Sequence, residues 1–255
     1  ELGACGGVPK QGHRDGVRGR GRSAGLDLAG RLMPELVSED PYVAQYAAQY
    51  AAASQPVAGW ERALEALSAH PEFTELVALS RSRGEALLAA GDLMRSIVRA
   101  VSGQQVSNAA ALKLSGRVLA AAGGARGQIL AEKLAALGPE GLRAQGLSRT
   151  KAQALNDLAL RFAAGEINEA ALANLSDHEV ALRLTAVRGV GPWTAHMILI
   201  FGLGRPDVWP LGDYGLRKAL QQAGISEGPH EEYAPWRTAA TWLLWRSLTQ
   251  SPVQY

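Results

Sequence analysis

Cysteine is nearly absent from this chain of 255 residues, which carries only Cys5. One cysteine can form no intramolecular disulfide, and it cannot supply the four thiolates of an iron–sulfur cluster. A reducing, intracellular compartment is therefore expected. Long apolar runs are also missing, because the most apolar stretch, residues 195–203, is too short to span a bilayer and Gly202 interrupts it. We therefore expect no membrane partner.

A strong net charge is the third absence, since 26 basic and 24 acidic residues leave a formal charge of +2. A chain so close to neutrality is no polycation, so any surface that binds nucleic acid must be a local patch. The length suits one or two domains that bury a substantial core.

The first 37 residues differ in composition from the rest. Glycine is dense there, and between positions 10 and 22 Lys10, Arg14, Arg18, Arg20 and Arg22 are opposed only by Asp15. This basic, glycine-rich composition offers no apolar periodicity and predicts that residues 1–37 are disordered. A basic arm that touches nucleic acid, an added tag and an incorrectly extended start are the alternatives.

From Ser38 onward apolar residues recur at helical spacing, and no alternating run marks a secure strand. We therefore predict an all-α fold. A stripe of three tyrosines at positions 42, 46 and 50 favours packing over ligand stacking. The expected helices cover residues 39–53, 57–69, 71–81, 92–102, 106–122, 128–137, 139–145, 148–164, 168–175, 177–186, 192–201, 214–223 and 234–248.

A tight turn from Val187 to Gly191 separates two of these helices. Glycines at 189 and 191 allow a positive φ or a close approach of the backbone to a ligand. Pro192 follows at the first position of a helix, where its missing N–H has no cost. The backbone N–H groups of that helix start would suit an anion such as a phosphodiester. The alternative is a turn that only joins two helices.

Asp213 stands at the end of a proline-bearing loop, residues 207–212, and at the start of a helix. Aspartate is a preferred N-cap, so a purely structural role is one interpretation. The other is functional, because three aromatic residues, Trp193, Tyr214 and Trp245, are candidates to surround this carboxylate, and its immediate neighbours supply no opposite charge.

These segments together resemble a known family. The run from Leu184 to Ala195 (LTAVRGVGPWTA), the run from Asp207 to Leu216 (DVWPLGDYGL), the Pro235-Trp236-Arg237 segment with Trp245, and the upstream segment 102–107 (SGQQVS) resemble the helix-hairpin-helix DNA glycosylases. The alkylpurine branch, the type II 3-methyladenine glycosylases, is the most similar. The resemblance covers roughly residues 60 to 250 and is far more specific as an ordered set than any one segment.

The resemblance implies two helical lobes that flank a DNA-binding cleft, one made of residues 38–92 plus 206–255 and the other of residues 93–205. It also implies a monofunctional enzyme that flips an alkylated purine out of duplex DNA and hydrolyses its N-glycosidic bond. Asp213 would be the catalytic carboxylate. Relatives that also cleave the strand have a lysine where this chain has Trp193, so no Schiff base is expected.

The remaining site residues follow from the same resemblance. Trp193, Met197, Tyr214 and Trp245 would contact the flipped base. DNA contacts would come from Gln104, Gln105, Gly189, Val190, Gly191 and Thr194, with Gln105 entering the duplex. The family often has an aromatic residue where Met197 stands and a second aspartate where Gly212 stands. An N-terminal β-rich domain found in some members has no room here.

No cofactor is expected to be required, although family hairpins often hold a monovalent cation on backbone carbonyls, here those of Thr185, Val187 and Val190. The expected partner is duplex DNA with damaged bases, and the expected protein is a cytoplasmic monomer, nucleoid-associated if bacterial. Two alternatives stay open. One is a non-catalytic helix-hairpin-helix module that binds DNA, and the other is a glycosylase of the same fold for another damaged base.

Overall fold

The computed structural model describes residues 55–89 and 91–248, and in this part the chain is helical. The predictions for residues 1–37 and for the helix 39–53 lie outside the described residues. The all-α class is confirmed. In the described part, no helix is both long and apolar enough to cross a membrane.

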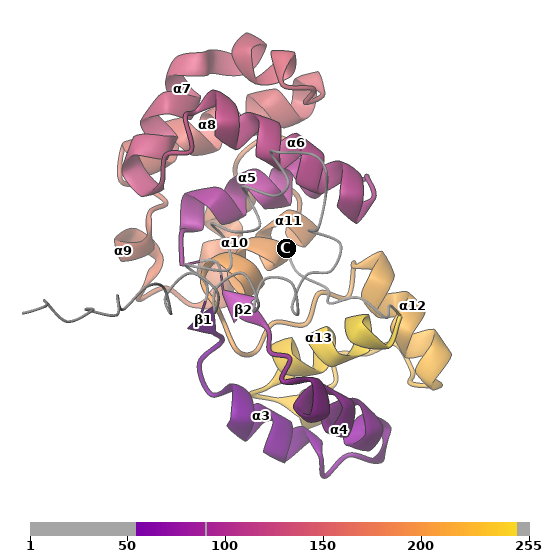
Figure 1. Cartoon of the computed structure of the whole chain (residues 1–255). Coiled ribbons are helices and arrows are strands. Elements are labelled where there is room, and N and C mark those ends of the chain that lie inside the picture. The colour runs from indigo at the N-terminus through magenta and orange to yellow at the C-terminus, as the bar shows by residue number, and fades with distance from the viewer. Residues whose placement is uncertain (1–54, 90, 249–255) are drawn as a thin grey trace, which may run out of the picture.

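Eleven α-helices are labelled in the described residues, with three short helical segments between them (Figure 1). The α-helices are α3 (Trp60–Leu67), α4 (Thr74–Arg83), α5 (Leu93–Gly103), α6 (Asn108–Ala121), α7 (Gly127–Ala144), α8 (Arg149–Ala163), α9 (Glu169–Leu172), α10 (Asp177–Thr185), α11 (Pro192–Met197), α12 (Tyr214–Ala223) and α13 (Arg237–Ser247). The short segments are the 3-10 helices η2 (Pro71–Phe73) and η4 (Glu231–Tyr233) and the π-helical η3 (Ile198–Gly202).

Most helix ends lie where the sequence predicts them, because local side chains form the caps. Ser107, Ser148 and Ser176 each accept a hydrogen bond from the backbone N–H three residues later. The helices predicted at 128–137 and 139–145 form one element, α7, with a bend where Gly138 has φ 63° and Pro139 follows. The predicted break is therefore a kink.

The predicted helix 57–69 is wrong at its start. Residues 55–56 form a short strand, β1 (Gln55–Pro56), that pairs antiparallel with β2 (Leu88–Ala89). The helix α3 begins only at Trp60, after Gly59 in a left-handed conformation. Two residues on each side are too few to produce an alternating pattern, and their pairing spans more than thirty positions, so periodicity could not predict this sheet.

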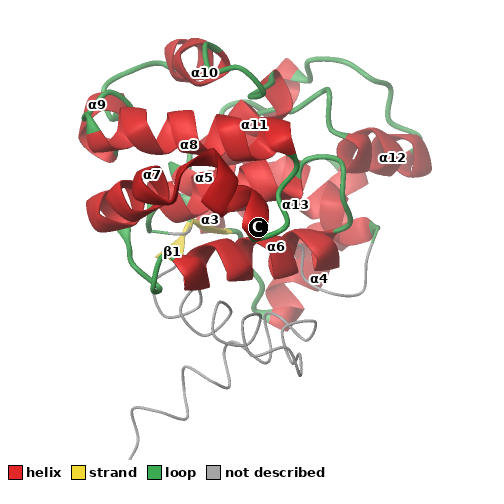
Figure 2. Cartoon of the chain, turned by 90° about the horizontal axis from the view of Figure 1, so that it is seen from above, coloured by secondary structure: helices red, strands yellow, loops and turns green. Residues whose placement is uncertain are grey.

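The helices gather above and below a central pair. Figure 1 shows α5 to α8 in the upper part, α3, α4, α12 and α13 in the lower part, and α10 and α11 between them. Figure 2 shows the same helices from above, with α11 close to α5. The residue boundaries of the two predicted lobes, 38–92 plus 206–255 and 93–205, stay a prediction.

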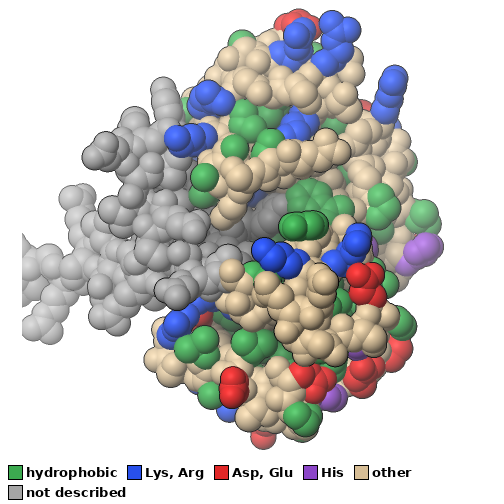
Figure 3. Space-filling model, turned by 90° about the vertical axis from the view of Figure 1, so that its right-hand side faces the viewer, with side chains coloured by type: hydrophobic (Ala, Val, Ile, Leu, Met, Phe, Trp, Pro, Cys, Tyr) green, Lys and Arg blue, Asp and Glu red, His purple; other side chains and the backbone are tan. Residues whose placement is uncertain are grey.

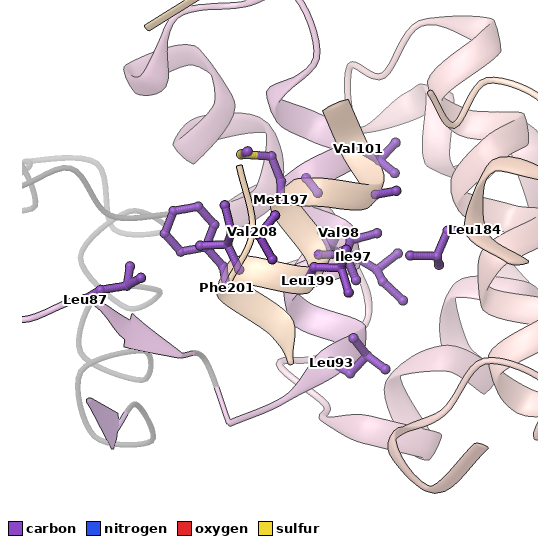
Figure 4. Close-up of a cluster of buried hydrophobic side chains, with 14 of the residues drawn as sticks. Leu87, Leu93, Ile97, Val98, Val101, Leu184, Met197, Leu199, Phe201 and Val208 are labelled. Atoms are coloured by element: carbon purple, nitrogen blue, oxygen red, sulfur yellow. The ribbon is translucent and has the colours of Figure 1, made fainter. Parts of the chain in front are cut away.

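Helix α5 lies at the centre of the fold, and all of its residues are buried. It packs against α6, α7, α8, α11 and η3. Figure 4 shows the contact with η3, where Ile97 and Val98 of α5 lie beside Leu199. The apolar side chains of α5 lie in the core, and its polar residues Arg95, Ser96, Arg99 and Ser102 are buried as well. It therefore gives a fixed support to the segments at its C-terminal end.

The loop from residue 203 to 213 is bound to the N-terminal end of α13. The Arg237 guanidinium makes two hydrogen bonds of 2.8 Å to the Asp207 carboxylate. Burial alone would raise the pKa of Asp207, but the hydrogen bonds from Arg237 outweigh it and lower that pKa. Thr238 accepts a hydrogen bond from the Val208 N–H at 2.9 Å and donates one to the Arg205 carbonyl at 2.7 Å. These contacts fix the loop that ends at Asp213.

Candidate active site and nucleic-acid interface

The carboxylate of Asp213 accepts three hydrogen bonds from neutral donors. Its Oδ1 accepts from the Leu216 N–H at 2.6 Å and from the Trp245 indole Nε1–H at 2.8 Å. Its Oδ2 accepts from the Trp193 indole Nε1–H at 2.7 Å. The two indoles lie 20 and 32 positions away in the sequence and come from α11 and α13. Asp213 is thus an N-cap, as the structural interpretation predicts, and it is also the meeting point of three helices.

This donor set suits an ionised carboxylate, which accepts hydrogen bonds and donates none. Indole and amide N–H groups orient the carboxylate and leave its charge in place, whereas a guanidinium or ammonium partner would neutralise it. Asp213 is 9% exposed, so its environment is partly dehydrated. A charge in such a setting acts more strongly on a nearby cation than it would in water. The arrangement can therefore stabilise positive charge that develops beside Asp213.

Trp193 and Trp245 differ in the surface they offer. Trp245 is 6% exposed, and its ring lies nearly parallel to that of Phe201, with centroids 6.0 Å apart. Its ring faces are therefore packed in the protein, and only its N–H edge reaches Asp213. Trp193 is half-buried and keeps part of its surface accessible. The prediction that Trp245 offers a ring face to a ligand is wrong for this structure.

Met197 and Tyr214, both predicted to contact the flipped base, differ in burial. Met197 is 1% exposed and belongs to the buried hydrophobic cluster of Figure 4. In this structure its side chain therefore offers no surface to a bound base. Tyr214 follows Asp213 directly as the first residue of α12 and is 78% exposed, so it can reach a ligand only from the solvent side.

The turn between α10 and α11, residues 186–191, is a tight hairpin whose two glycines differ. Gly189 has φ 91°, and a Cβ built there lies 3.1 Å from the Thr150 methyl group and 3.2 Å from the Ala154 Cβ. The fold itself therefore requires glycine at this position. Gly191 has φ −95°, and a Cβ built there meets nothing within 4 Å. Gly191 is the N-cap of α11, and the open space beside it would let a ligand approach the backbone closely.

The valines of this hairpin hold it to the core. Val187 and Val190 are 1% and 5% exposed, and the Val190 N–H donates to the Val187 carbonyl at 3.0 Å. Only the backbone of Val190 is available for the predicted DNA contact. Gly191 itself is exposed and caps α11, so the exposed backbone of the hairpin faces solvent.

Two of the residues predicted to contact DNA, Gln104 and Thr194, bond to each other. The Gln104 amide Nε2 donates at 2.9 Å to the Gly189 carbonyl and at 2.9 Å to the Thr194 hydroxyl. Thr194 is 2% exposed, so its side chain offers no surface to DNA. The predicted DNA contact through the Thr194 side chain is therefore not available in this structure, whereas that of the half-buried Gln104 stays a prediction. Gln105 is exposed and has φ 54°, which is uncommon for a residue other than glycine.

A lysine that sequence reasoning missed lies beside these residues. Lys151, in the first turn of α8, is half-buried and donates from Nζ to the Ser102 carbonyl at 3.0 Å. Burial lowers the pKa of this ammonium group. The position of Lys151 in the sequence was itself an indication, because a cation in the first turn of a helix interacts unfavourably with the helix dipole. Such a placement points to a partner elsewhere in the fold.

Basic side chains are visible on one side of the molecule. Figure 3 shows the side from which α12 projects in Figure 1, with a hollow across its middle. Lys and Arg side chains lie above the hollow and beside it, whereas Asp and Glu side chains gather mainly on the lower part. This uneven distribution gives a chain of nearly zero net charge a local positive surface. Among the described residues, no group of three His, Cys, Asp or Glu side chains could hold a metal ion.

Comparison with known proteins decides the family. A sequence profile described as "HhH-GPD superfamily base excision DNA repair protein" matches residues 98–240, which is more than half of the chain. This chain belongs to the HhH-GPD superfamily. The matched range holds the hairpin, Gln104, Trp193 and Asp213. Trp245 lies just beyond it.

Individual HhH-GPD relatives agree with this assignment. The chain is 28% identical over 203 residues to the YfjP protein of Bacillus subtilis, across 74% of this chain and 71% of that protein. It is 33% identical over 162 residues to DNA-3-methyladenine glycosylase 1 of Schizosaccharomyces pombe, across 59% of this chain and 70% of that protein. The solved structure of the S. pombe 3-methyladenine DNA glycosylase in complex with abasic DNA is similar, with a TM-score of 0.62 and 28% identity over 73% of this chain and 96% of that one.

Proposed function

We propose that this protein is a monofunctional DNA glycosylase, which hydrolyses the N-glycosidic bond of alkylated purines such as 3-methyladenine and 7-methylguanine in duplex DNA. The observation that carries the proposal is the Asp213 carboxylate, which two indoles and one amide orient without neutralising it. The names of the S. pombe relatives support the same substrate class.

The proposed reaction needs one negative charge and one water molecule. Alkylation at N3 of adenine or N7 of guanine makes the base cationic. The bond between sugar C1′ and N9 breaks, its electron pair moves to the purine, and a neutral base leaves without prior protonation. Positive charge then develops on the sugar, where the Asp213 carboxylate stabilises it. Water adds to C1′ and loses its proton to solvent or to that carboxylate.

The base would be received mainly by Trp193 and Tyr214, the two aromatic residues near Asp213 that keep accessible surface. Any purine can stack on an aromatic face, and a cationic purine gains an additional cation–π attraction there. Trp245 would orient the carboxylate through its N–H and would not stack on the base, because its ring is packed against Phe201. This division of roles favours cationic lesions over neutral damaged bases.

The hairpin would bind the DNA backbone through the N–H groups at the start of α11. We expect Gly191→Ala to weaken binding to all duplexes alike, damaged or not, because a methyl group would separate these N–H groups from a phosphate. Thermal unfolding should be unchanged, since the added Cβ meets nothing within 4 Å and φ is −95°. Fluorescence anisotropy with matched damaged and undamaged duplexes measures the effect.

Gly189→Ala is the matched control for this prediction. Its positive φ and its contacts with Thr150 and Ala154 make a methyl group costly to the fold itself, so thermal stability should fall. A Gly191→Ala variant that altered lesion preference at unchanged affinity would contradict the phosphate role.

A monovalent cation could assist this grip, held by the backbone carbonyls of Thr185, Val187 and Val190. Carbonyl oxygens are suitable ligands for hard cations, and the Val187 carbonyl, which accepts one hydrogen bond, retains a second lone pair. When bound, the ion would supply positive charge toward a phosphate. The chemistry at Asp213 does not depend on it.

The proposed function is tested by base release from duplexes that each carry one lesion. We expect free 3-methyladenine and 7-methylguanine to be released, while uracil and oxidised guanine stay bound. The product strand should break only after alkali treatment, and borohydride should trap no protein–DNA adduct, because Trp193 occupies the position of the lysine nucleophile. Binding without release of any base would favour a non-catalytic module, and a trapped adduct would make Lys218 the first suspect.

A further inference from the structure

Three segments far apart in the sequence meet at the C-terminal end of α5. The first is the loop that joins α5 to α6, residues 104–107, named here the wedge loop because it carries Gln105. The second is the hairpin at 186–191, and the third is the first turn of α8. Gln104 bonds the wedge loop to the hairpin, Gly189 places the hairpin against α8, and Lys151 bonds α8 to Ser102, two residues before the wedge loop, so the three segments are linked around the end of α5.

Gln104 joins the wedge loop to the hairpin. Its amide nitrogen donates to the Gly189 carbonyl and to the Thr194 hydroxyl, which are 85 and 90 positions away. An amide nitrogen has two hydrogens, so both donors are used. The half-buried Gln104 side chain therefore joins the wedge loop both to the hairpin and to α11.

Lys151 joins the first turn of α8 to the end of α5. Its ammonium group donates to the Ser102 carbonyl, one of the last carbonyls of α5, where a cation also complements the helix dipole. Its position at the start of α8 is unfavourable for a cation, and burial lowers its pKa. The energetics of α8 alone therefore do not explain a lysine at this position. Its hydrogen bond to the end of α5, directly before the wedge loop, does explain it.

The third link joins α8 to the hairpin. Gly189 lies so close to Thr150 and Ala154 that an added Cβ would be 3.1 to 3.2 Å from their side chains. The hairpin therefore rests on the same turn of α8 that carries Lys151. With all three links in place, the wedge loop has little freedom relative to the hairpin, and Gln105 is held at φ 54°.

We propose that Gln104 and Lys151 are positioning residues, which lock the wedge loop to the hairpin so that Gln105 enters the duplex at a fixed offset from the bound phosphates. This inference rests on the proposed function. Extrusion of a base costs a few kcal/mol. A wedge loop that is already ordered loses little conformational entropy on binding DNA, so more of its binding free energy can compensate for that cost. A loosened wedge would bind DNA but would extrude a paired base poorly.

The test compares two substrates that differ in how hard the base is to extrude. One duplex carries 7-methylguanine opposite cytosine, and the other carries it opposite an abasic site, where no pairing must be broken. The variants are Gln104→Ala, Lys151→Met and the conservative Lys151→Arg. Exposed residues provide matched controls, Gln153→Ala on α8 and Lys113→Met on α6. Single-turnover base release, affinity for undamaged duplex and thermal unfolding are measured for each.

We expect Gln104→Ala to slow release from the paired substrate about fivefold and Lys151→Met about tenfold or more, in line with the loss of a neutral and a charged hydrogen bond. Opposite the abasic site the loss should shrink to about twofold. Affinity for undamaged duplex should stay unchanged, since the hairpin still binds phosphate. Lys151→Arg should recover most of the activity, and both control variants should match the wild type.

Equal losses on the two substrates would overturn the inference, because a merely structural defect does not depend on pairing. Fluorescence of 2-aminopurine paired with thymine reports extrusion of a paired base without any bond cleavage, and variants with wild-type extrusion of this base would also overturn it. If the wild type released no base yet the variants lowered this extrusion signal, the proposed hydrolysis would fail while the positioning role held. The two failures are thus distinguishable.

Discussion

Asp213→Asn should slow the release of alkylated purines by at least about 10²- to 10³-fold, which corresponds to about 3–4 kcal/mol of lost transition-state stabilisation. The reason is electrostatic. Asparagine is close in size to aspartate and can still cap α12, but it carries no charge to oppose the one that develops on the sugar. The measurement is single-turnover release of 7-methylguanine from a duplex with a single lesion.

The hydrogen bonds of Asp213 decide how this variant must be controlled. If the asparagine carbonyl keeps the bonds from Leu216 and Trp245, its NH₂ group faces the Trp193 indole N–H, and two donors oppose each other. Some loss of stability is therefore expected in addition to the loss of charge. The double variant Asp213→Asn/Trp193→Phe removes the opposing donor and should regain stability but no activity.

Near-wild-type release of 7-methylguanine by Asp213→Asn would remove this carboxylate from the mechanism. Recovery of activity in the double variant would show that donor repulsion had caused the defect. Affinity for undamaged duplex should be the same for all three proteins, since the hairpin is unaltered.

Trp245→Phe should lower the rate of base release about tenfold or more, because a hydrogen bond to a charged group is worth about 1.5–3 kcal/mol. The substitution keeps an aromatic ring on Phe201 and removes the indole N–H that bonds Oδ1 of Asp213 at 2.8 Å. The carboxylate would then be held by Leu216 and Trp193 alone among these three donors. The loss should lie in the rate of the chemical step and leave DNA affinity unchanged.

Trp242→Phe on the same helix is the matched control. Trp242 is 1% exposed and packs edge to face on Trp60, with ring centroids 5.1 Å apart. Its replacement should lower thermal stability and leave the single-turnover rate of the folded protein unchanged. If both tryptophan variants lost activity in proportion to stability, the indole of Trp245 would have no specific effect on Asp213.

Local chemistry allowed much of this protein to be predicted from its sequence. A serine cap, a glycine with positive φ or a proline after a bend acts within a few residues, so helix boundaries and the kink at Gly138 could be predicted. The hairpin and the position of Asp213 at a helix start are local in the same sense. The family resemblance rested on these segments because each is a short run of neighbouring residues.

Contacts between residues far apart in the sequence could be identified only from the tertiary structure. Helical spacing placed Met197 on the same face as Trp193, but spacing does not say that this face is pressed onto α5 and η3. Met197 is therefore buried in this structure, whereas Tyr214 keeps most of its surface accessible.

The residue types of the site could be read from the sequence: one carboxylate at a helix start, a hairpin with two glycines, and tryptophan where a lysine nucleophile would stand. Their contacts came from the packing of the helices. Trp193 and Trp245 bind Asp213 through their N–H edges, and Gln104 binds the hairpin. The physical reason is that a side chain's hydrogen-bond partner depends on the packing of helices 20 to 90 positions apart, about which local propensity carries no information.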